Sequence, residues 1–532
     1  MGSGLDVCNA GVGLVEYLGM QNTSMVVSVV VGLVGFGWLT PTGAGAGVGS
    51  GAGSEVGGAV IGWVDDGESA SEIEARGVEA MRRGDWEGAR GAFEALVELK
   101  PRSYVGYYNL ASVLCRVGDL DSAGESLDRA IALGFVDRGQ LLRDGDLRAL
   151  RETAYFKELM AQWDATILTR RGIDLAQMNA LVKAKKMEHR TIEGLRLEVV
   201  SAHDPVSTDQ AVAELELITE WAEGAVFDGL GRSIGMGGGS DSAWVMVGLP
   251  DTHGFTKWAV GVFGPGARSG ISSIGGAYEH QQRRLVAQDL GATLRHEFVH
   301  VLHWRDMSRL GQNHAAWIQE GLASVVEDFD VVGGRLVPVA SWRTNMVKRL
   351  QRARKLPRIA DLAGMDLETF TGRRPLARYA QARTVLMWLM ERGELRAFYH
   401  TYIDTYGEDR TGLLALTQVT GLEGEEMDRV YREWVADLEE VAETGSDLEA
   451  TLGISIRSGD GDGVLITKLS GEARRRTGLR MGSVITGING RATRDLHELI
   501  RVLGSYGVGD VVTVQWRRGT LHGENSAELI GR

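Results

Sequence analysis

The chain has 532 residues, of which 24% are charged and 44% hydrophobic, a composition typical of globular proteins, and its length predicts three or four domains. The formal net charge is −14, and the first 75 residues hold eight acids but no lysine or arginine. The sequence has no basic patch of the kind that binds nucleic acid. With only two cysteines, Cys8 and Cys115, a disulfide framework is excluded.

The first 70 residues read as a leader followed by a glycine-rich linker. An apolar run of 15 residues extends from Met25 to Leu39, which is short for a membrane-spanning helix and typical of a signal-peptide core. No basic residue precedes it, but translation starting at Met25 would supply the missing positive charge. The alternatives are an uncleaved membrane anchor and a disordered leader. We therefore expect an exported protein that is periplasmic or membrane-anchored.

Residues 71–165 contain a repeat of predicted helix pairs. Its markers Gly84, Asp85, Ala89, Phe93 and Pro101 are followed 34 residues later by Gly118, Asp119, Ala123, Leu127 and Phe135. This period, with small residues where helices touch, resembles the tetratricopeptide repeat. The resemblance implies a concave face that binds a protein partner, and a generic stack of helical hairpins is the alternative. Residues 143–159 are expected to close the array, with Cys115 buried inside it.

Residues 190–290 have the pattern of a mixed α/β region. Alternating or continuous apolar residues predict strands over 195–201, 243–248 and 258–263, and helical periodicity predicts a helix over 207–224. A short glycine-containing strand is expected around 274–278. Residues 330–440 are predicted to be mainly helical.

Between these regions the chain reads His-Glu-Phe-Val-His at 296–300. On a helix, His296 and His300 project from one face and can bind one zinc ion, and Glu297 lies beside that metal as a general base. A catalytic zinc site needs a third protein ligand. Glu320 follows in another apolar, helix-like run, and an antiparallel pair of helices would bring it to the metal.

Other residues near the motif could compete for the metal. His303 lies on the same helix face as His296, and Asp306 follows three residues later. In metzincins the position of His303 is a glycine that turns the chain toward a third ligand at the position of Asp306, and that glycine is missing here. We expect His303 to bond a neighbouring carbonyl or carboxylate, Asp306 to point away and His314 to be an exposed loop histidine. Glu327 is either a carboxylate that orients a ligand histidine or a solvated acid.

The pattern Trp317, Glu320, Gly321 and Ala323 resembles the third-ligand helix of gluzincin metallopeptidases, and more narrowly the bacterial peptidase MA-like branch. The resemblance implies zinc bound by His296, His300 and Glu320, and Glu297 as the base in peptide hydrolysis. It further implies that substrate pairs with an edge strand at Gly276 to Tyr278.

A residue that stabilises the oxyanion is also expected in this class of enzyme. Tyr379 opens a helix-like run, in an order that resembles the segment carrying the oxyanion tyrosine in related aminopeptidases. A core tyrosine at the start of a helix is the alternative for Tyr379.

Residues 450–532 resemble a PDZ domain of the type attached to bacterial proteases. Ser470-Gly471-Glu472-Ala473 and the run from Gly478 to Ile485 match its pattern, although Gly471 replaces proline and Ser483 replaces aspartate. The resemblance implies a groove for peptide C-termini, or for the chain's own protease domain. Its residues would be Leu452, Gly453, Ile454, Leu496, Leu499 and Ile500.

We therefore expect a multidomain α+β protein: leader and linker at 1–70, tetratricopeptide-like helices at 71–165, a zincin-like α+β core at 190–440 and a small β-rich PDZ domain at 450–532. The expected function is zinc-dependent hydrolysis of peptide or protein substrates. Because no acidic motif for binding a substrate amino group precedes His296, an endopeptidase is favoured. The alternatives are a non-catalytic interaction scaffold on a degenerate peptidase core and a non-peptidase zinc hydrolase.

Overall fold

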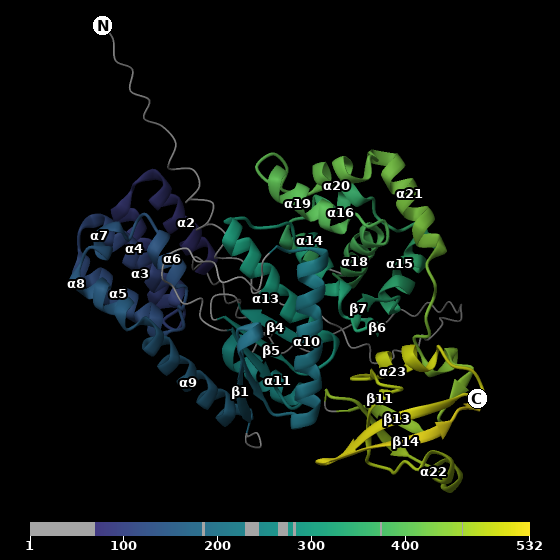
Figure 1. Cartoon of the computed structure of the whole chain (residues 1–532). Coiled ribbons are helices and arrows are strands. Elements are labelled where there is room, and N and C mark those ends of the chain that lie inside the picture. Colours follow the sequence, from purple (N-terminus) through teal and green to yellow (C-terminus); the bar gives the residue numbers. More distant parts are fainter. Residues whose placement is uncertain are drawn as a thin grey trace, which may run out of the picture. The chain divides into compact units, whose positions relative to one another are not determined.

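The structure is a computed structural model that describes residues 70–182, 187–228, 244–263, 275–279, 283–372, 375–459 and 461–532. These residues fold as two compact units that adjoin in the sequence after Trp163 (Figure 1). The combination of helices and sheets over more than one unit agrees with the predicted multidomain α+β class. The apolar run from Met25 to Leu39 lies outside the described residues.

The first unit is helical, and its helices repeat with the predicted period. Asp85 caps α3 by accepting a hydrogen bond from the Gly88 N–H (3.0 Å). Asp119, 34 residues later, caps α5 through the Ser122 N–H (3.2 Å). The residues that repeat every 34 positions therefore include the side chains that cap helices. The described helices of this unit are α2 (Ala70–Arg83), α3 (Trp86–Leu99), α4 (Tyr104–Val117), α5 (Leu120–Ala132), α6 (Arg138–Arg143), α7 (Arg148–Arg151) and α8 (Ala154–Ala161).

The second unit begins at Asp164, within α9 (Trp163–Val182), and then forms a five-stranded sheet of order β1-β2-β3-β5-β4. Strands β2, β3 and β5 are parallel, whereas β1 and β4 pair antiparallel at the two edges. Its elements are β1 (Glu188–Ile192), β2 (Leu197–Ser201), α10 (Pro205–Ala225), β3 (Trp244–Gly248), α11 (Thr252–Phe263), β4 (Gly276–Glu279), β5 (Arg284–Ala287) and α13 (Ala292–Leu310).

Both faces of this sheet are buried, which explains its nearly continuous apolar strands. On one face, Leu197 and Met246 share an apolar cluster with residues of α10 and α13. On the other face, Val200 and Val247 share a cluster with residues of α11. The predicted edge position of Gly276 is confirmed, because β4 pairs with β5 alone among the described strands.

The strand expected over 258–263 is wrong, because these residues belong to helix α11. Phe255, Trp258 and Ala259 are buried at the spacing of one helix face, and the Asp251 side chain accepts a hydrogen bond from the Gly254 N–H (2.7 Å) at the helix start. A short apolar run does not distinguish a buried helix from a strand.

Helices α14 (Ala316–Val325) and α18 (Pro375–Glu391) pack closely against each other in the second unit. A Cβ at Gly321 of α14 would lie 3.1 Å from the Ala382 carbonyl oxygen and 2.9 Å from Leu386. The described elements here are α14 (Ala316–Val325), β6 (Phe329–Val332), β7 (Arg335–Pro338), α15 (Trp342–Arg352), α16 (Ile359–Ala363), α17 (Leu367–Thr371), α18 (Pro375–Glu391), α19 (Leu395–Thr405), α20 (Leu413–Thr420) and α21 (Gly424–Asp437). The region is mainly helical, as predicted, with the added β6–β7 hairpin.

The C-terminal module has its own sheet, of order β14-β13-β11-β10-β9 with β12 beside β11, and its own apolar cluster. Asn489 (φ 51°) and Gly490 (φ 78°) form the two-residue turn between β11 and β12, where positive φ favours these residue types. Its elements are β8 (Ala450–Thr451), β9 (Ser455–Ser458), β10 (Val464–Lys468), α22 (Gly471–Thr477), β11 (Val484–Ile488), β12 (Arg491–Ala492), α23 (Leu496–Leu503), β13 (Val511–Arg518), β14 (Leu521–Glu528) and β15 (Ile530–Gly531).

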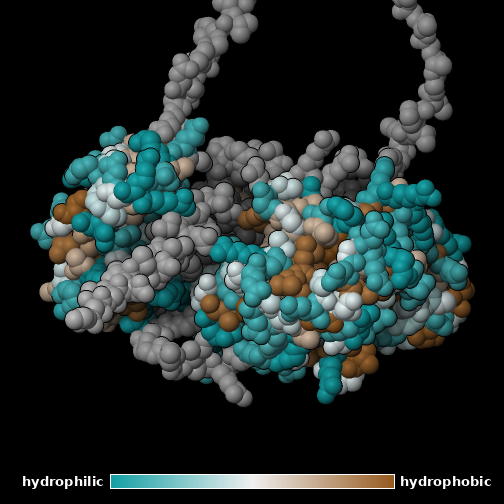
Figure 2. Space-filling model, turned by 90° about the horizontal axis from the view of Figure 1, so that it is seen from above, coloured by the Kyte–Doolittle hydropathy of each residue, from teal (hydrophilic) through white to brown (hydrophobic). Residues whose placement is uncertain are grey.

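The face shown in Figure 2 is mainly hydrophilic, and its hydrophobic residues occur in small groups. Among the described residues, no helix has the length and apolar character needed to cross a membrane.

The close approach at Gly321 leads to a stability prediction. We expect Gly321→Ala to lower the free energy of unfolding by about 1–3 kcal/mol, because the added methyl group overpacks the α14–α18 contact. Urea denaturation measures this change. The control is Gly172→Ala in α9, where a Cβ meets nothing within 4 Å, so that helix propensity makes the change neutral or stabilising. Equal effects of the two substitutions would contradict the packing argument.

Candidate metal centre

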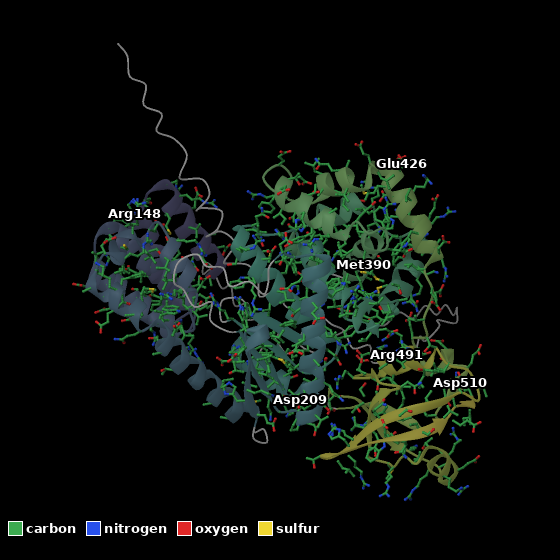
Figure 3. All side chains as sticks on the ribbon, in the orientation of Figure 1. Arg148, Asp209, Met390, Glu426, Arg491 and Asp510 are labelled. Carbon is green, nitrogen blue, oxygen red and sulfur yellow. The ribbon has the colours of Figure 1, made fainter. Side chains whose placement is uncertain are left out.

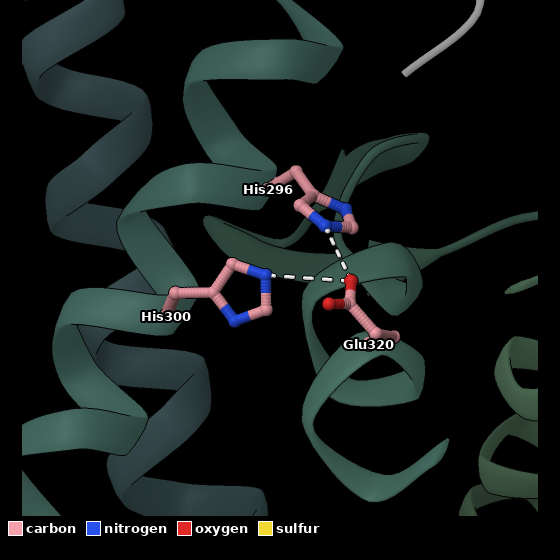
Figure 4. Close-up of side chains that lie close together, drawn as sticks. All are labelled: His296, His300 and Glu320. Carbon is pink, nitrogen blue, oxygen red and sulfur yellow. Dashed lines mark hydrogen bonds and ion pairs between the residues drawn. The ribbon is translucent and has the colours of Figure 1, made fainter. Parts of the chain in front are cut away.

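Helix α13 presents the two histidines of the motif to the interior, one turn apart. His296 and His300 are 0% and 3% exposed, and they project from the same face toward α14 (Figure 4). Glu320 on α14 is also buried, and its Oε2 lies 3.1 Å from His296 Nε2 and 3.4 Å from His300 Nε2. The structure thus brings together the three residues that the sequence proposes as ligands.

The donor set suits a zinc ion. Two imidazole nitrogens and one carboxylate oxygen lie within 4.8 Å of one another. Ligand atoms about 2.0–2.1 Å from a tetrahedral zinc are themselves about 3.3 Å apart, which is close to the 3.1 and 3.4 Å between Glu320 Oε2 and the two imidazole nitrogens. Glu320 Oε1 is buried with no hydrogen-bond partner among the described residues. No other cluster of three or more potential ligands occurs in the part of the chain that the structure describes.

Charge at the site follows from burial and pairing. Burial raises the pKa of Glu320, but His300 and His296 outweigh it and lower this pKa to about 2. Burial lowers the pKa of His296, but hydrogen bonds to Glu320 and Glu327 raise it to about 10. Since a metal needs neutral imidazole, ion binding must displace that proton. Burial lowers the pKa of His300, which favours its neutral form.

Glu297 lies on α13 between the two histidines and is fully buried. A Cβ at Gly276, the first residue of edge strand β4, would lie 2.8 Å from Glu297 Cγ and 3.1 Å from its Oε1. The glycine therefore lets the backbone of β4 pass beside the carboxylate. Glu297 and the edge strand predicted to hold substrate are adjacent.

Tyr379 lies near the same group, in the second turn of α18. Its ring centroid is 6.1 Å from that of His296. Burial, together with the negative charges of Glu320 and Glu297, raises the pKa of Tyr379 well above its ordinary value, so the phenol keeps its proton. A protonated phenol beside the ligand cluster is compatible with the predicted oxyanion donor, which stays a prediction.

Glu327 is a buried carboxylate in contact with a predicted ligand. It is 1% exposed, and its Oε1 lies 2.8 Å from His296 Nδ1. Arg343, fully buried, donates to both Glu327 oxygens, with Nη2 2.7 Å from Oε1. Burial raises the pKa of Glu327, but Arg343 and His296 lower it to about 2. The solvated alternative for Glu327 is wrong, because α15 covers it with a buried cation.

His303 and Asp306 have partners away from the three-residue cluster. His303 Nε2 lies 2.8 Å from His314 Nδ1. Asp306 accepts a hydrogen bond from the Tyr399 hydroxyl (2.8 Å). The expectation that His314 is exposed is wrong, because it is 2% exposed and its ring packs near the rings of Tyr399 and Tyr402. The expected carbonyl or carboxylate partner of His303 is instead an imidazole.

The sequence did not predict the role of Arg295 and Arg343, which both donate hydrogen bonds to Glu327. Arg295 directly precedes His296 and donates to the Glu327 carbonyl (2.9 Å). Arg343 follows in α15, where no spacing relates it to the motif. Their partners are distant in sequence, so that no local pattern marks them.

Five of the six predicted peptide-groove residues belong to, or pack against, one apolar cluster of the C-terminal module. Leu452, Leu499 and Ile500 are buried in it, and Ile454 and Leu496 pack against it. Strand β9 is an edge of the sheet. In the loop before it, the Gly453 N–H donates to Thr451 Oγ1 (3.1 Å).

Comparison with known proteins finds partial likenesses, and no family model matches the chain. A tetratricopeptide repeat protein 36 homolog of Nematostella vectensis is 39% identical over 69 residues, which are 13% of this chain and 38% of that protein. A chloroplastic protein of Arabidopsis thaliana is 26% identical over 101 residues, 18% of this chain and 30% of that protein. The chain thus spans less than two fifths of either relative.

Among solved structures, an aminopeptidase N family protein from Idiomarina loihiensis aligns over 65% of this chain and 67% of its own, with 11% identity and a TM-score of 0.25. That likeness is distant.

We expect Glu327→Gln to weaken zinc binding by about 10–100-fold, because the carboxylate that orients His296 loses its charge. Competition with a fluorescent chelator measures the affinity. The matched control is Glu220→Gln, an exposed residue of α10. Wild-type affinity in Glu327→Gln would contradict an orienting role.

The buried histidine pair predicts a pH dependence of stability. Burial lowers the pKa of His314 to about 3 and that of His303 well below its ordinary value. As pH falls below about 6.5, the unfolded chain takes up protons that the folded pair does not, so stability is lost toward about pH 3. We expect His314→Gln to flatten the slope of unfolding free energy between pH 6.5 and 4, measured in urea. The exposed control His253→Gln should keep that slope; an unchanged slope in His314→Gln would refute the assignment.

Proposed function

We propose that the chain is a zinc-dependent peptidase, and more narrowly an endopeptidase of the gluzincin type. The observation that carries the proposal is the buried group of His296, His300 and Glu320, with Glu297 on the same helix turn as the first ligand. The proposed zinc ligands are these three residues. Zinc bound here would lower the pKa of a water molecule and polarise the substrate carbonyl.

The chain's own residues supply the remaining steps. The backbone of edge strand β4 pairs with an extended substrate and holds the scissile bond beside Glu297. Glu297 accepts a proton from the attacking water and then delivers it to the leaving amine. Water adds to the carbonyl carbon, the carbon–nitrogen bond breaks, and the products are a carboxylic acid and an amine. Tyr379 donates a hydrogen bond to the oxyanion.

The flanking regions are proposed to bind proteins. The repeat at 71–165 would hold a protein partner, as the tetratricopeptide likeness over part of the chain supports. The C-terminal module at 450–532 would accept a peptide C-terminus between β9 and α23, with the exposed backbone of β9 pairing to it. The catalytic core would comprise 190–440. Export through the leader is a further part of the proposal.

Metal analysis and hydrolysis of a peptide library by the wild type and Glu297→Gln test the proposal. We expect about one zinc per chain in both proteins, and a kcat lowered by about 10²–10⁴-fold in the variant, since the base is lost while the ligands remain.

Tyr379→Phe should lower kcat by about 10²–10³-fold with little change in KM.

Glu220→Gln, exposed on α10, is the matched charge control and should keep full activity. Unchanged hydrolysis in Glu297→Gln would refute the mechanism. A zinc-loaded wild type that cleaves no peptide of the library would favour the interaction scaffold.

A further inference from the structure

Arg295, the residue before the first proposed ligand, joins three parts of the second unit. It is 3% exposed. Its Nε and Nη2 donate to Glu214 Oε2 of α10 at 2.9 and 2.7 Å. Its Nη1 donates to the Glu327 carbonyl at 2.9 Å and also to Glu498 of α23, in the C-terminal module. The first turn of α13 is therefore bonded to a residue 203 positions away in the chain.

Glu498 is held in place within its own module. It is 2% exposed, its N–H donates to Asp495 Oδ1 at the start of α23 (2.8 Å), and its Oε2 accepts from the Arg494 N–H (2.6 Å). Arg494 in turn places Nη2 3.0 Å from Glu214 Oε1. Two acids and two arginines thus alternate in a network that closes through the Arg494 N–H. Arg295, Arg494 and Glu498 are buried in it, and Glu214 is partly buried.

Backbone contacts bring the same module to the start of α13. The Leu290 N–H donates to the Gly461 carbonyl (2.7 Å). A Cβ at Gly461 would lie 2.4 Å from the Gln288 carbonyl oxygen, and a Cβ at Gly291 would lie 2.7 Å from Arg494 Cβ. The chain that leads into α13 is therefore in close contact with the C-terminal module, and glycine permits the approach on both sides.

We propose that Glu498 is a positioning residue of the metal centre, and that the C-terminal module completes this centre through Arg295. Glu498 fixes the guanidinium of Arg295. That guanidinium holds both the first turn of α13, which directly precedes His296, and the carbonyl of Glu327, whose carboxylate orients the His296 ring. The inference rests on the proposed zinc site and not on peptide hydrolysis.

A second ion pair across the same interface provides a control for the contact between Glu498 and Arg295. Arg491 of β12 (labelled in Figure 3) pairs with Asp330 of β6, with Nη2 2.7 Å from Oδ2. This ion pair also joins the module to the rest of the unit, but it does not involve Arg295. Loss of the Arg491–Asp330 pair weakens the interface but leaves the hydrogen bond between Glu498 and Arg295 of α13 in place.

The test measures zinc affinity of the full-length protein by competition with a fluorescent chelator. We expect Glu498→Gln to weaken zinc binding by about tenfold, at the low end of effects seen for residues that support metal ligands, and Arg491→Gln to change it less than twofold. In the Arg295→Lys background, which removes the guanidinium fork, Glu498→Gln should have little further effect, because the two residues act as one path.

Wild-type zinc affinity in a folded Glu498→Gln variant would overturn the proposal, as would an equal loss in Arg491→Gln or a full additional loss in the Arg295→Lys background. Circular dichroism establishes whether Glu498→Gln is folded. Should that variant unfold, Arg295→Lys alone carries the test, and unchanged affinity there overturns the proposal.

The two proposals fail in different ways. If the wild type binds zinc but cleaves no peptide, the proposed function is refuted, and the zinc assay still decides the role of Glu498. If the wild type binds no zinc, both proposals are refuted.

Discussion

The Glu320 carboxylate lies between two buried imidazoles, and the surrounding structure has to pair and hydrogen-bond each of these buried ionisable groups. Ionisable groups in an apolar interior are stable only when they are paired and hydrogen-bonded. His296 and His300 both face Glu320, and His296 also contacts Glu327. Each added acid then needs its own cation, which Arg343 supplies to Glu327.

Close packing of backbones makes this arrangement possible. Gly321, next to Glu320, lets α18 approach α14, and α18 carries Tyr379. Gly276 lets the edge strand pass beside Glu297. Absence of a side chain at these two positions places a helix and a strand against the two carboxylates of the site. Helices α13 and α14 therefore hold His296, His300 and Glu320, while β4 is an edge strand among the described strands.

The sequence predicted those features that depend on local spacing. The His-Glu-x-x-His motif lies on a helix as expected, and the helix caps at Asp85 and Asp119 repeat with the predicted period. In each case the signal is periodicity or capping within one or two turns.

Features that depend on distant partners were missed. Burial of His314 depends on tyrosines nearly 90 residues away, and the helix over 252–263 is formed where a short apolar run fits a strand equally well. Arg295 has partners at Glu214 and Glu498, a set that no single-sequence pattern reveals.

X-ray absorption at the zinc edge of the metal-loaded protein measures the proposed coordination of one ion by His296, His300 and Glu320. We expect one zinc per chain, with two imidazole nitrogens at about 2.0–2.1 Å, one carboxylate oxygen at about 2.0–2.2 Å and a further position open to water. Absence of bound zinc, or a shell of three imidazoles that includes His303, would contradict this coordination.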